Sequence, residues 1–175
     1  MTRTCSWGVL LLPRPERPGG SSANETTALG VVPQDDAERV RQVVEELAEP
    51  VVLVGRSYGG MVITELADHP AVALAVYPAA FRPRPGRSVK DFLGGELPNW
   101  VVPHDNDTVT VTEDFEVARD ASYADIEPGL AADDPRRLQP RSISSLSAPR
   151  SPRKRTHLVT YNVCEQDNAL PVKAR

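Results

Sequence analysis

The feature that most constrains this chain is a five-residue turn, residues 55–59, with the sequence GRSYG. The segment before it, Val51–Val54, is apolar at every position, which is typical of a strand covered on both faces in a parallel sheet. A tight turn of this composition between a strand and a helix presents a serine side chain above the edge of a sheet. We therefore predict that Ser57 is a candidate nucleophile between two elbow glycines, Gly55 and Gly59. A plain glycine-rich turn is the alternative.

Further apolar runs predict strands elsewhere in the chain, at Gly8–Leu12, Ala71–Tyr77 and Leu158–Cys164. Strands that alternate with helices favour a parallel sheet, because right-handed crossover helices then cover its faces. The fold class that we predict is α/β: a three-layer α/β/α arrangement around a mostly parallel sheet.

Helical spacing of apolar residues predicts two helices around the turn. The first begins at Asp35, which would cap the helix with Glu38 in a capping box, and ends before Pro50. The second covers Met61–Ala67 and stops at the His69-Pro70 pair.

We expect a single domain over residues 1–175, with a lid insertion over about residues 82–150. Within the insertion, the pattern predicts a hairpin of Trp100–Val102 with Thr108–Val111 and a helix near Phe115–Ala124. Trp100 and Phe92 are candidates to line a pocket, with plain packing as the alternative. The polar tract Gly20–Leu29 carries no predicted element.

The charge balance limits the partners that the chain can bind. It has 20 Lys and Arg against 24 Asp and Glu, a net charge of −4, which creates no general attraction for nucleic acid or an anionic membrane. Arg150 and the basic residues 153–155 form a local exception. No aromatic residues are interleaved with them, so a solvated loop is the better interpretation. We expect neither nucleic acid nor a membrane as a partner.

The two cysteines, Cys5 and Cys164, lie far apart and lack the spacing of a metal site or a disulfide framework. Cys164 ends an apolar run, which predicts a buried thiol. The apolar run Val9–Leu12 is too short for a signal-peptide core or a membrane span. We therefore expect a cytoplasmic protein without a metal ion or cofactor.

The sequence around the turn resembles that of the α/β-hydrolases, in particular the esterase-like branch related to plant methylesterases and hydroxynitrile lyases. The segments that carry this resemblance are VVLVGRSYGGMVITELA, AVYPAAFRPRPGRSVKDFL, FEVARDASYADI, LQPRSISSL and TYNVCEQDNALP. They span most of residues 35–171.

The resemblance implies a Ser-Asp-His triad in that chain order. Ser57 would be the nucleophile, Asp167 the acid and the Tyr58 backbone N–H an oxyanion donor. Because parallel strands end at one edge of a sheet, the turn and the segment with Asp167 are expected to share a crevice. The alternative for Asp167 is a turn-forming aspartate, and Glu165 is a less favoured acid.

No histidine follows Asp167, although the family's base comes after the acid. His69 lies 12 residues past Ser57, about 18 Å away along a helix. His157 begins the strand that leads to Asp167, which separates the two by more than about 20 Å. His104 lies in the lid insertion, where a solvated turn is the main interpretation and a base from the lid the alternative.

The chain departs from the branch in two further ways: it has no His-Gly pair for a second oxyanion donor, and Arg56 stands where the branch has a histidine. The resemblance implies a serine hydrolase of small carboxylic esters. Because loss of a triad base costs about a millionfold in turnover, we expect weakened or absent activity. The alternative is a non-catalytic fragment or small-molecule-binding remnant, since both ends of the chain look truncated.

Overall fold

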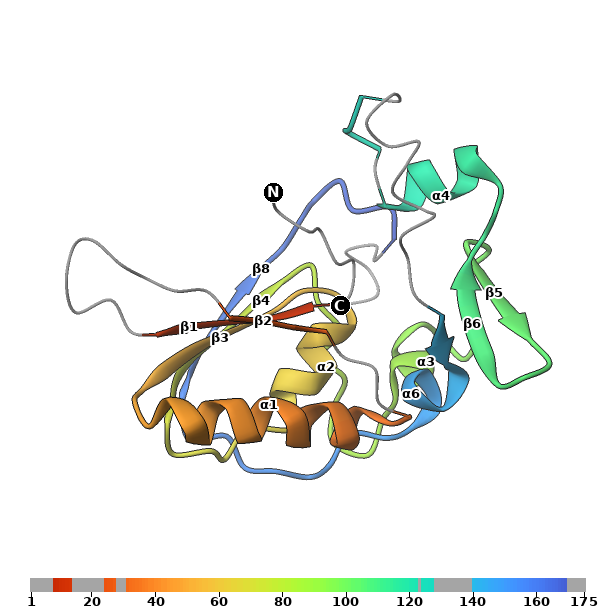
Figure 1. Ribbon diagram of the computed structural model, residues 1–175. Helices are drawn as coiled ribbons and strands as arrows, with labels where there is room; N and C mark the ends of the chain where they lie inside the picture. Colours follow the sequence, from red (N-terminus) through yellow and green to blue (C-terminus); the bar gives the residue numbers. More distant parts are fainter. Residues whose placement is uncertain (1–7, 14–23, 28–30, 123, 128–139, 170–175) are drawn as a thin grey trace.

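The computed structural model describes residues 8–13, 24–27, 31–122, 124–127 and 140–169. Their main element is a five-stranded sheet in the order β2-β1-β3-β4-β8 (Figure 1). The strands are β1 (Gly8–Pro13), β2 (Asn24–Thr27), β3 (Val51–Gly55), β4 (Val72–Pro78) and β8 (Leu158–Asn162). Strands β3, β4 and β8 run parallel, whereas β1 is antiparallel to both β2 and β3. The predicted α/β fold class is confirmed.

Strand β2 lies in the polar tract for which the sequence predicted no element. It pairs antiparallel with β1, with Gly8 opposite Thr27. In the sheet order it stands at one end, and polar residues are common in end strands because they discourage pairing with a further chain. Its two threonines also favour an extended backbone.

Two helices, α1 (Pro33–Leu47) and α2 (Tyr58–Thr64), lie on the same side of this sheet (Figure 1). Val51 and Leu53 are fully buried, whereas Val52 and Val54 are half-buried. The prediction that this run is covered on both faces holds only in part: burial alternates along β3 between fully buried and half-buried residues, with the period of a strand.

Helix α1 begins two residues before the predicted N-cap. Val32 is the N-cap and Pro33 the first helical residue, a position that proline favours because no N–H is lost there. Asp35 is not the cap; its carboxylate instead accepts a hydrogen bond from the Val32 N–H, at 3.4 Å. The prediction failed because Asp35 has the residue type of a cap but sits at the third helical position.

Helix α2 begins and ends three residues earlier than the predicted helix, although residues 61–67 are all buried as expected. After Thr64 the chain continues as turns, in which the N–H groups of Glu65, Leu66 and Ala67 each donate to the carbonyl three residues earlier. This is the tighter 3₁₀ pattern that often ends a helix. The apolar pattern predicted burial correctly but could not distinguish the two hydrogen-bond patterns.

The segment that the sequence predicts to be a lid insertion, about residues 82–150 and called the lid insertion below, contains a three-stranded antiparallel sheet in the order β5-β6-β7. Strands β5 and β6 form the predicted hairpin, and α4 is the predicted helix, ending two residues early. The elements are α3 (Val89–Phe92), β5 (Val101–His104), β6 (Thr108–Val111), α4 (Phe115–Ser122), β7 (Arg141–Ser142) and α6 (Ile143–Ser147).

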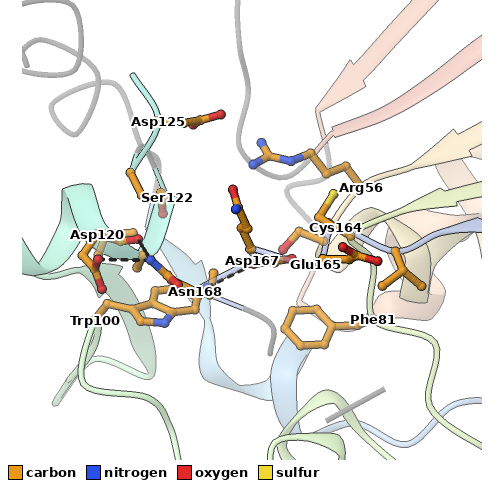
Figure 2. Close-up of a pocket in the computed structure, with 18 residues that line it drawn as sticks. Arg56, Phe81, Trp100, Asp120, Ser122, Asp125, Cys164, Glu165, Asp167 and Asn168 are labelled. Carbon is orange, nitrogen blue, oxygen red and sulfur yellow. Dashed lines mark hydrogen bonds between the residues drawn. The ribbon is translucent and has the colours of Figure 1, made fainter. Parts of the chain in front are cut away.

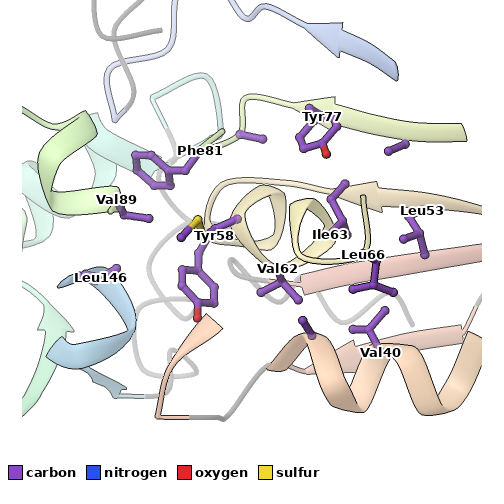
Figure 3. Close-up of a cluster of buried hydrophobic side chains, with 14 of the residues drawn as sticks. Val40, Leu53, Tyr58, Val62, Ile63, Leu66, Tyr77, Phe81, Val89 and Leu146 are labelled. Atoms are coloured by element: carbon purple, nitrogen blue, oxygen red, sulfur yellow. The ribbon is translucent and has the colours of Figure 1, made fainter. Parts of the chain in front are cut away.

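One apolar cluster joins the sheet, the two helices and the lid insertion. Figure 3 shows Tyr58 of α2 near Phe81, Val89 and Leu146, so residues from the insertion contribute to the core. Within the described ranges, no helix is both long and apolar enough to cross a membrane.

Candidate active site

Ser57 lies at the corner between β3 and α2, where the sequence predicts it. Its φ of 51° and ψ of −123° are rare for a residue with a side chain and cost about 1–3 kcal/mol. Two hydrogen bonds with the segment after β4 hold this backbone: the Ser57 N–H donates to the Ala79 carbonyl at 3.0 Å, and the Phe81 N–H donates to the Ser57 carbonyl at 2.9 Å. The segment after β4 therefore supports the strained corner.

Two glycines near Ser57, Gly55 and Gly60, are required by close contacts. A Cβ atom on Gly55 would lie 2.5 Å from the carbonyl oxygen of Gly59, which is too close for any side chain. A Cβ atom on Gly60 would lie 2.6 Å from Ala80 Cβ and 2.7 Å from the Phe81 carbonyl oxygen. Gly60 was missed by the sequence analysis, although the Gly-Gly doublet after Tyr58 could have indicated it.

A cavity of about 830 Å³ opens at this corner and is lined by both Ser57 and Asp167. The structure thus brings these two residues to one cavity, although 110 residues separate them. Figure 2 shows its two sides: Asp120, Ser122 and Trp100 from the lid insertion on one, and Arg56, Cys164, Glu165 and Phe81 on the other. The volume is sufficient for a small organic molecule.

Asp167 lies five residues beyond the end of β8, in a loop that borders the cavity. Its Oδ1 atom accepts a hydrogen bond from the Ala169 N–H at 3.1 Å. This is the local bond of a turn-forming aspartate, which was the alternative interpretation of Asp167. Asp167 therefore both forms a turn and borders the cavity. Glu165 lines the same cavity.

The three histidines of the chain lie away from the described lining of the cavity. His69 is buried, its Nδ1 accepts from the Ala71 N–H at 3.3 Å, and its Nε2 lies 3.8 Å from the Glu45 carboxylate. His104 is exposed on β5. His157 precedes β8, and burial, aided by nearby arginines, lowers the pKa of its imidazole. None of the three is among the described residues that line the cavity beside Ser57.

Carboxylates dominate the charge of the cavity. Asp120 and Asp125 stand on one side and Glu165 on the other, whereas Arg56, next to the nucleophile candidate, is the cation among the described lining residues. Such a surface disfavours anionic molecules through simple charge repulsion. Among the described residues, no three or more His, Cys, Asp or Glu side chains form a group that could hold a metal ion.

Cys164 was predicted to be a buried core thiol, and this is wrong. It is exposed and lines the cavity. Strand β8 ends at Asn162, two residues earlier than the apolar run suggested, so Cys164 falls in the loop that follows. Leu158, at the other end of the run, is 76% exposed.

The two aromatic residues proposed from the lid insertion have different positions. Trp100 lines the cavity, as predicted. Phe92 instead packs edge-on against Phe81, with ring centroids 5.8 Å apart, and it is Phe81 that lines the cavity. Phe92 therefore has the plain packing role that the sequence analysis kept as its alternative.

The chain is similar in sequence to two proteins described as hydrolases. It is 50% identical over 56 residues to a carbendazim hydrolyzing esterase of Nocardioides sp. (strain SG-4G), which is 31% of this chain and 23% of that protein. It is 28% identical over 156 residues to the alpha/beta hydrolase nvfD of Aspergillus novofumigatus, 78% of this chain and 60% of that protein. The chain thus spans less than two thirds of the length of these relatives.

Solved structures share its fold. An extracellular alpha/beta-hydrolase from Paenibacillus species superposes with a TM-score of 0.67 at 20% identity, over 81% of this chain and 62% of that one. A pyrethroid hydrolase from Sphingobium faniae JZ-2 superposes with a TM-score of 0.64 at 21% identity, over 83% and 63%. A sequence profile described as the Alpha/beta hydrolase family matches residues 5–175. The chain belongs to the alpha/beta hydrolase family.

Proposed function

We propose that this chain binds small carboxylic esters in the cavity beside Ser57 and reacts with them slowly through the Ser57 hydroxyl. The observation that carries the proposal is the strained corner at Ser57, which borders the same 830 Å³ cavity as Asp167. Strain at a single residue that lines a cavity is typical of functional positions.

In the proposed reaction, Ser57 Oγ attacks the carbonyl carbon of the ester. The negative charge that develops on the carbonyl oxygen is stabilised by the Tyr58 backbone N–H. The bond to the alcohol oxygen then breaks, the alcohol leaves with a proton, and the acyl group stays on Ser57 until water releases it. Asp167 would orient a base, as in related triads.

The histidine positions limit the rate of this reaction. Because no histidine lines the described part of the cavity, the base that takes the proton of Ser57 in this proposal is water or a small base from solution, which Asp167 would orient. We therefore propose turnover far below that of a complete triad, by a factor of up to about a million.

The cavity favours neutral esters with an apolar or aromatic part. Phe81 and Trp100 provide aromatic surface, and the carboxylates of Asp120, Asp125 and Glu165 disfavour anionic substrates. Two proteins similar to this chain are described as a carbendazim hydrolyzing esterase and a pyrethroid hydrolase. Their names support an organic ester or a related carbonyl compound as the substrate class.

Labelling with a neutral fluorophosphonate tests the proposal. We expect an adduct on Ser57, identified by mass spectrometry, that is absent in Ser57→Ala. Added imidazole should accelerate the labelling, because it can act as the base that the cavity lacks. Folded protein that forms no adduct even with imidazole would overturn the proposed reaction.

The second candidate function is binding without chemistry, and the positions of His69, His104 and His157 favour it. The two candidates make different predictions for Ser57→Ala. If binding is the function, this variant should bind a neutral aromatic ester as well as the unaltered chain does, and neither protein should release the alcohol. Alcohol release that is lost in Ser57→Ala would exclude this candidate.

A further inference from the structure

A buried charge pair connects the lid insertion to the start of α1. Arg141, on β7, donates a hydrogen bond from Nη2 to Asp36 Oδ2 at 2.9 Å. The Arg141 side chain is 5% exposed and that of Asp36 is fully buried. The two residues are 105 positions apart in the sequence, so this contact fixes the insertion against the main sheet unit.

Tyr58, the residue directly after Ser57, is held by the same pair. Its hydroxyl donates to Asp36 Oδ2 at 3.0 Å, and the Arg141 guanidinium lies 4.0 Å from the centroid of its ring. Burial raises the pKa of the Tyr58 phenol, which keeps the hydroxyl protonated as a donor. The ring is thus fixed both at its face and at its hydroxyl end.

A buried ion pair is weak support for stability, because desolvation of both charges offsets much of their attraction. An apolar pair of similar volume would fill the same space at least as well. What apolar side chains would not supply is a fixed direction for the tyrosine hydroxyl and a planar group over its ring. The geometry therefore suits positioning better than stabilisation.

Tyr58 is also the first residue of α2, and its backbone follows the strained corner directly. Because the Tyr58 ring is held at two points, the peptide unit between Ser57 and Tyr58 has less freedom to rotate. This unit includes the Tyr58 N–H, which the proposed function assigns to the oxyanion. A misplacement of such groups by about 1 Å can lower a rate by about a hundredfold.

We infer that Arg141 is a positioning residue: through Asp36 and the Tyr58 ring, it sets the orientation of the Ser57–Tyr58 backbone and makes the reactivity of Ser57 depend on the seating of the lid insertion. This inference rests on the proposed function, because its consequence for rate requires that Ser57 reacts.

The test uses Arg141→Lys, which keeps a positive charge for Asp36 but loses the planar group over Tyr58. A second variant, Asp36→Asn combined with Arg141→Met, removes both buried charges together and so leaves neither of them unpaired. The matched control is Arg153→Met, which breaks ion pairs with Asp68 and with the buried Glu65, both in the turns that follow α2.

The rate of Ser57 labelling by a neutral fluorophosphonate is measured at several label concentrations with imidazole present. The thermal unfolding midpoint of each variant is measured as well, to show that it is folded. We expect both Arg141 variants to lose about tenfold or more in the maximal labelling rate, with a similar half-saturating concentration, whereas Arg153→Met keeps its rate. Folded variants that label at the unaltered maximal rate would overturn the inference.

A second readout separates this inference from the proposed function. The amide ¹⁵N and ¹H chemical shifts of Ser57 and Tyr58 report the backbone whether or not the serine reacts. We expect them to shift in Arg141→Lys and to remain in place in Arg153→Met. If the unaltered chain is never labelled, the proposed function fails; unchanged amide shifts in Arg141→Lys overturn the positioning role independently.

Discussion

Asn168 is bonded to Asp120 across one end of the cavity. Its Nδ2 atom donates to both the backbone oxygen and Oδ1 of Asp120, each at 3.1 Å (Figure 2). Asn168 follows the candidate acid Asp167, and Asp120 lies on α4 of the lid insertion. These two bonds therefore join the loop after β8 to the insertion, at a place where both border the cavity.

Replacement of Asn168 by aspartate should loosen this end of the cavity. The new carboxylate would face two oxygens of Asp120, so two attractive bonds become repulsive contacts. We expect Trp100, which is 7% exposed, to become more accessible to acrylamide quenching, measured in a Trp7→Phe background. Gln166→Glu adds the same charge to the cavity lining and is the control. Equal quenching in the two variants would contradict the role of Asn168.

Gly55→Ala should destabilise the corner strongly. Its Cβ atom would meet the carbonyl group of Gly59 at 2.5–2.6 Å, so strand and helix must separate. We expect a loss of about 3 kcal/mol in the free energy of unfolding, measured by urea titration. Gly86→Ala is the control: its φ is +77° but nothing lies within 4 Å of its Cβ, so only backbone strain of about 1 kcal/mol is expected. Similar losses in both variants would contradict the packing argument.

Val32→Thr should stabilise the chain. Val32 is the N-cap of α1, with an extended backbone (φ −132°, ψ 161°) and no side-chain acceptor for the first helical N–H groups. A threonine hydroxyl can accept such a bond, which is worth about 1 kcal/mol. The thermal midpoint should rise in this variant and stay constant in Val31→Thr, which alters the exposed residue before the cap. No difference between the two would show that the cap position contributes nothing.

Stability should fall in mild acid because of His157. Burial lowers the pKa of its imidazole in the folded chain, and neither ring nitrogen has a hydrogen-bond partner there. Below about pH 6.5 the unfolded chain therefore binds a proton that the folded chain resists, so stability declines as pH falls through that value. In His157→Gln the thermal midpoint should decline less between about pH 7 and pH 5. The same change in the exposed His104→Gln would argue against this cause.

The parts of the fold that the sequence predicted correctly depend on local patterns. The turn around Ser57 and the hairpin of β5 and β6 follow from short runs of residues, and the structure has both. Helix boundaries were less accurate, since the N-cap of α1 is Val32, an apolar residue, whereas the sequence pattern points to a polar cap such as Asp35.

The contacts that shape the candidate site were less accessible to sequence reasoning. Nothing in the spacing of Asp36 and Arg141 indicates that they meet, because the contact depends on how the lid insertion packs against α1. The exposure of Cys164 likewise depends on the residue at which β8 stops pairing, which an apolar run does not determine. Both positions are determined by contacts between residues that are far apart in the sequence.

The cavity has one more consequence, because its lining comes from four separate stretches of the chain: the corner at Ser57, the segment with Phe81, the lid insertion with Trp100 and the loop with Asp167. A small molecule seated there would touch all four, and complete unfolding would have to release it. At a hundred times its dissociation constant, such a molecule adds about 2.7 kcal/mol to the free energy of unfolding. A screen of melting temperatures against a panel of neutral esters can therefore identify ligands of this chain even if Ser57 never turns one over.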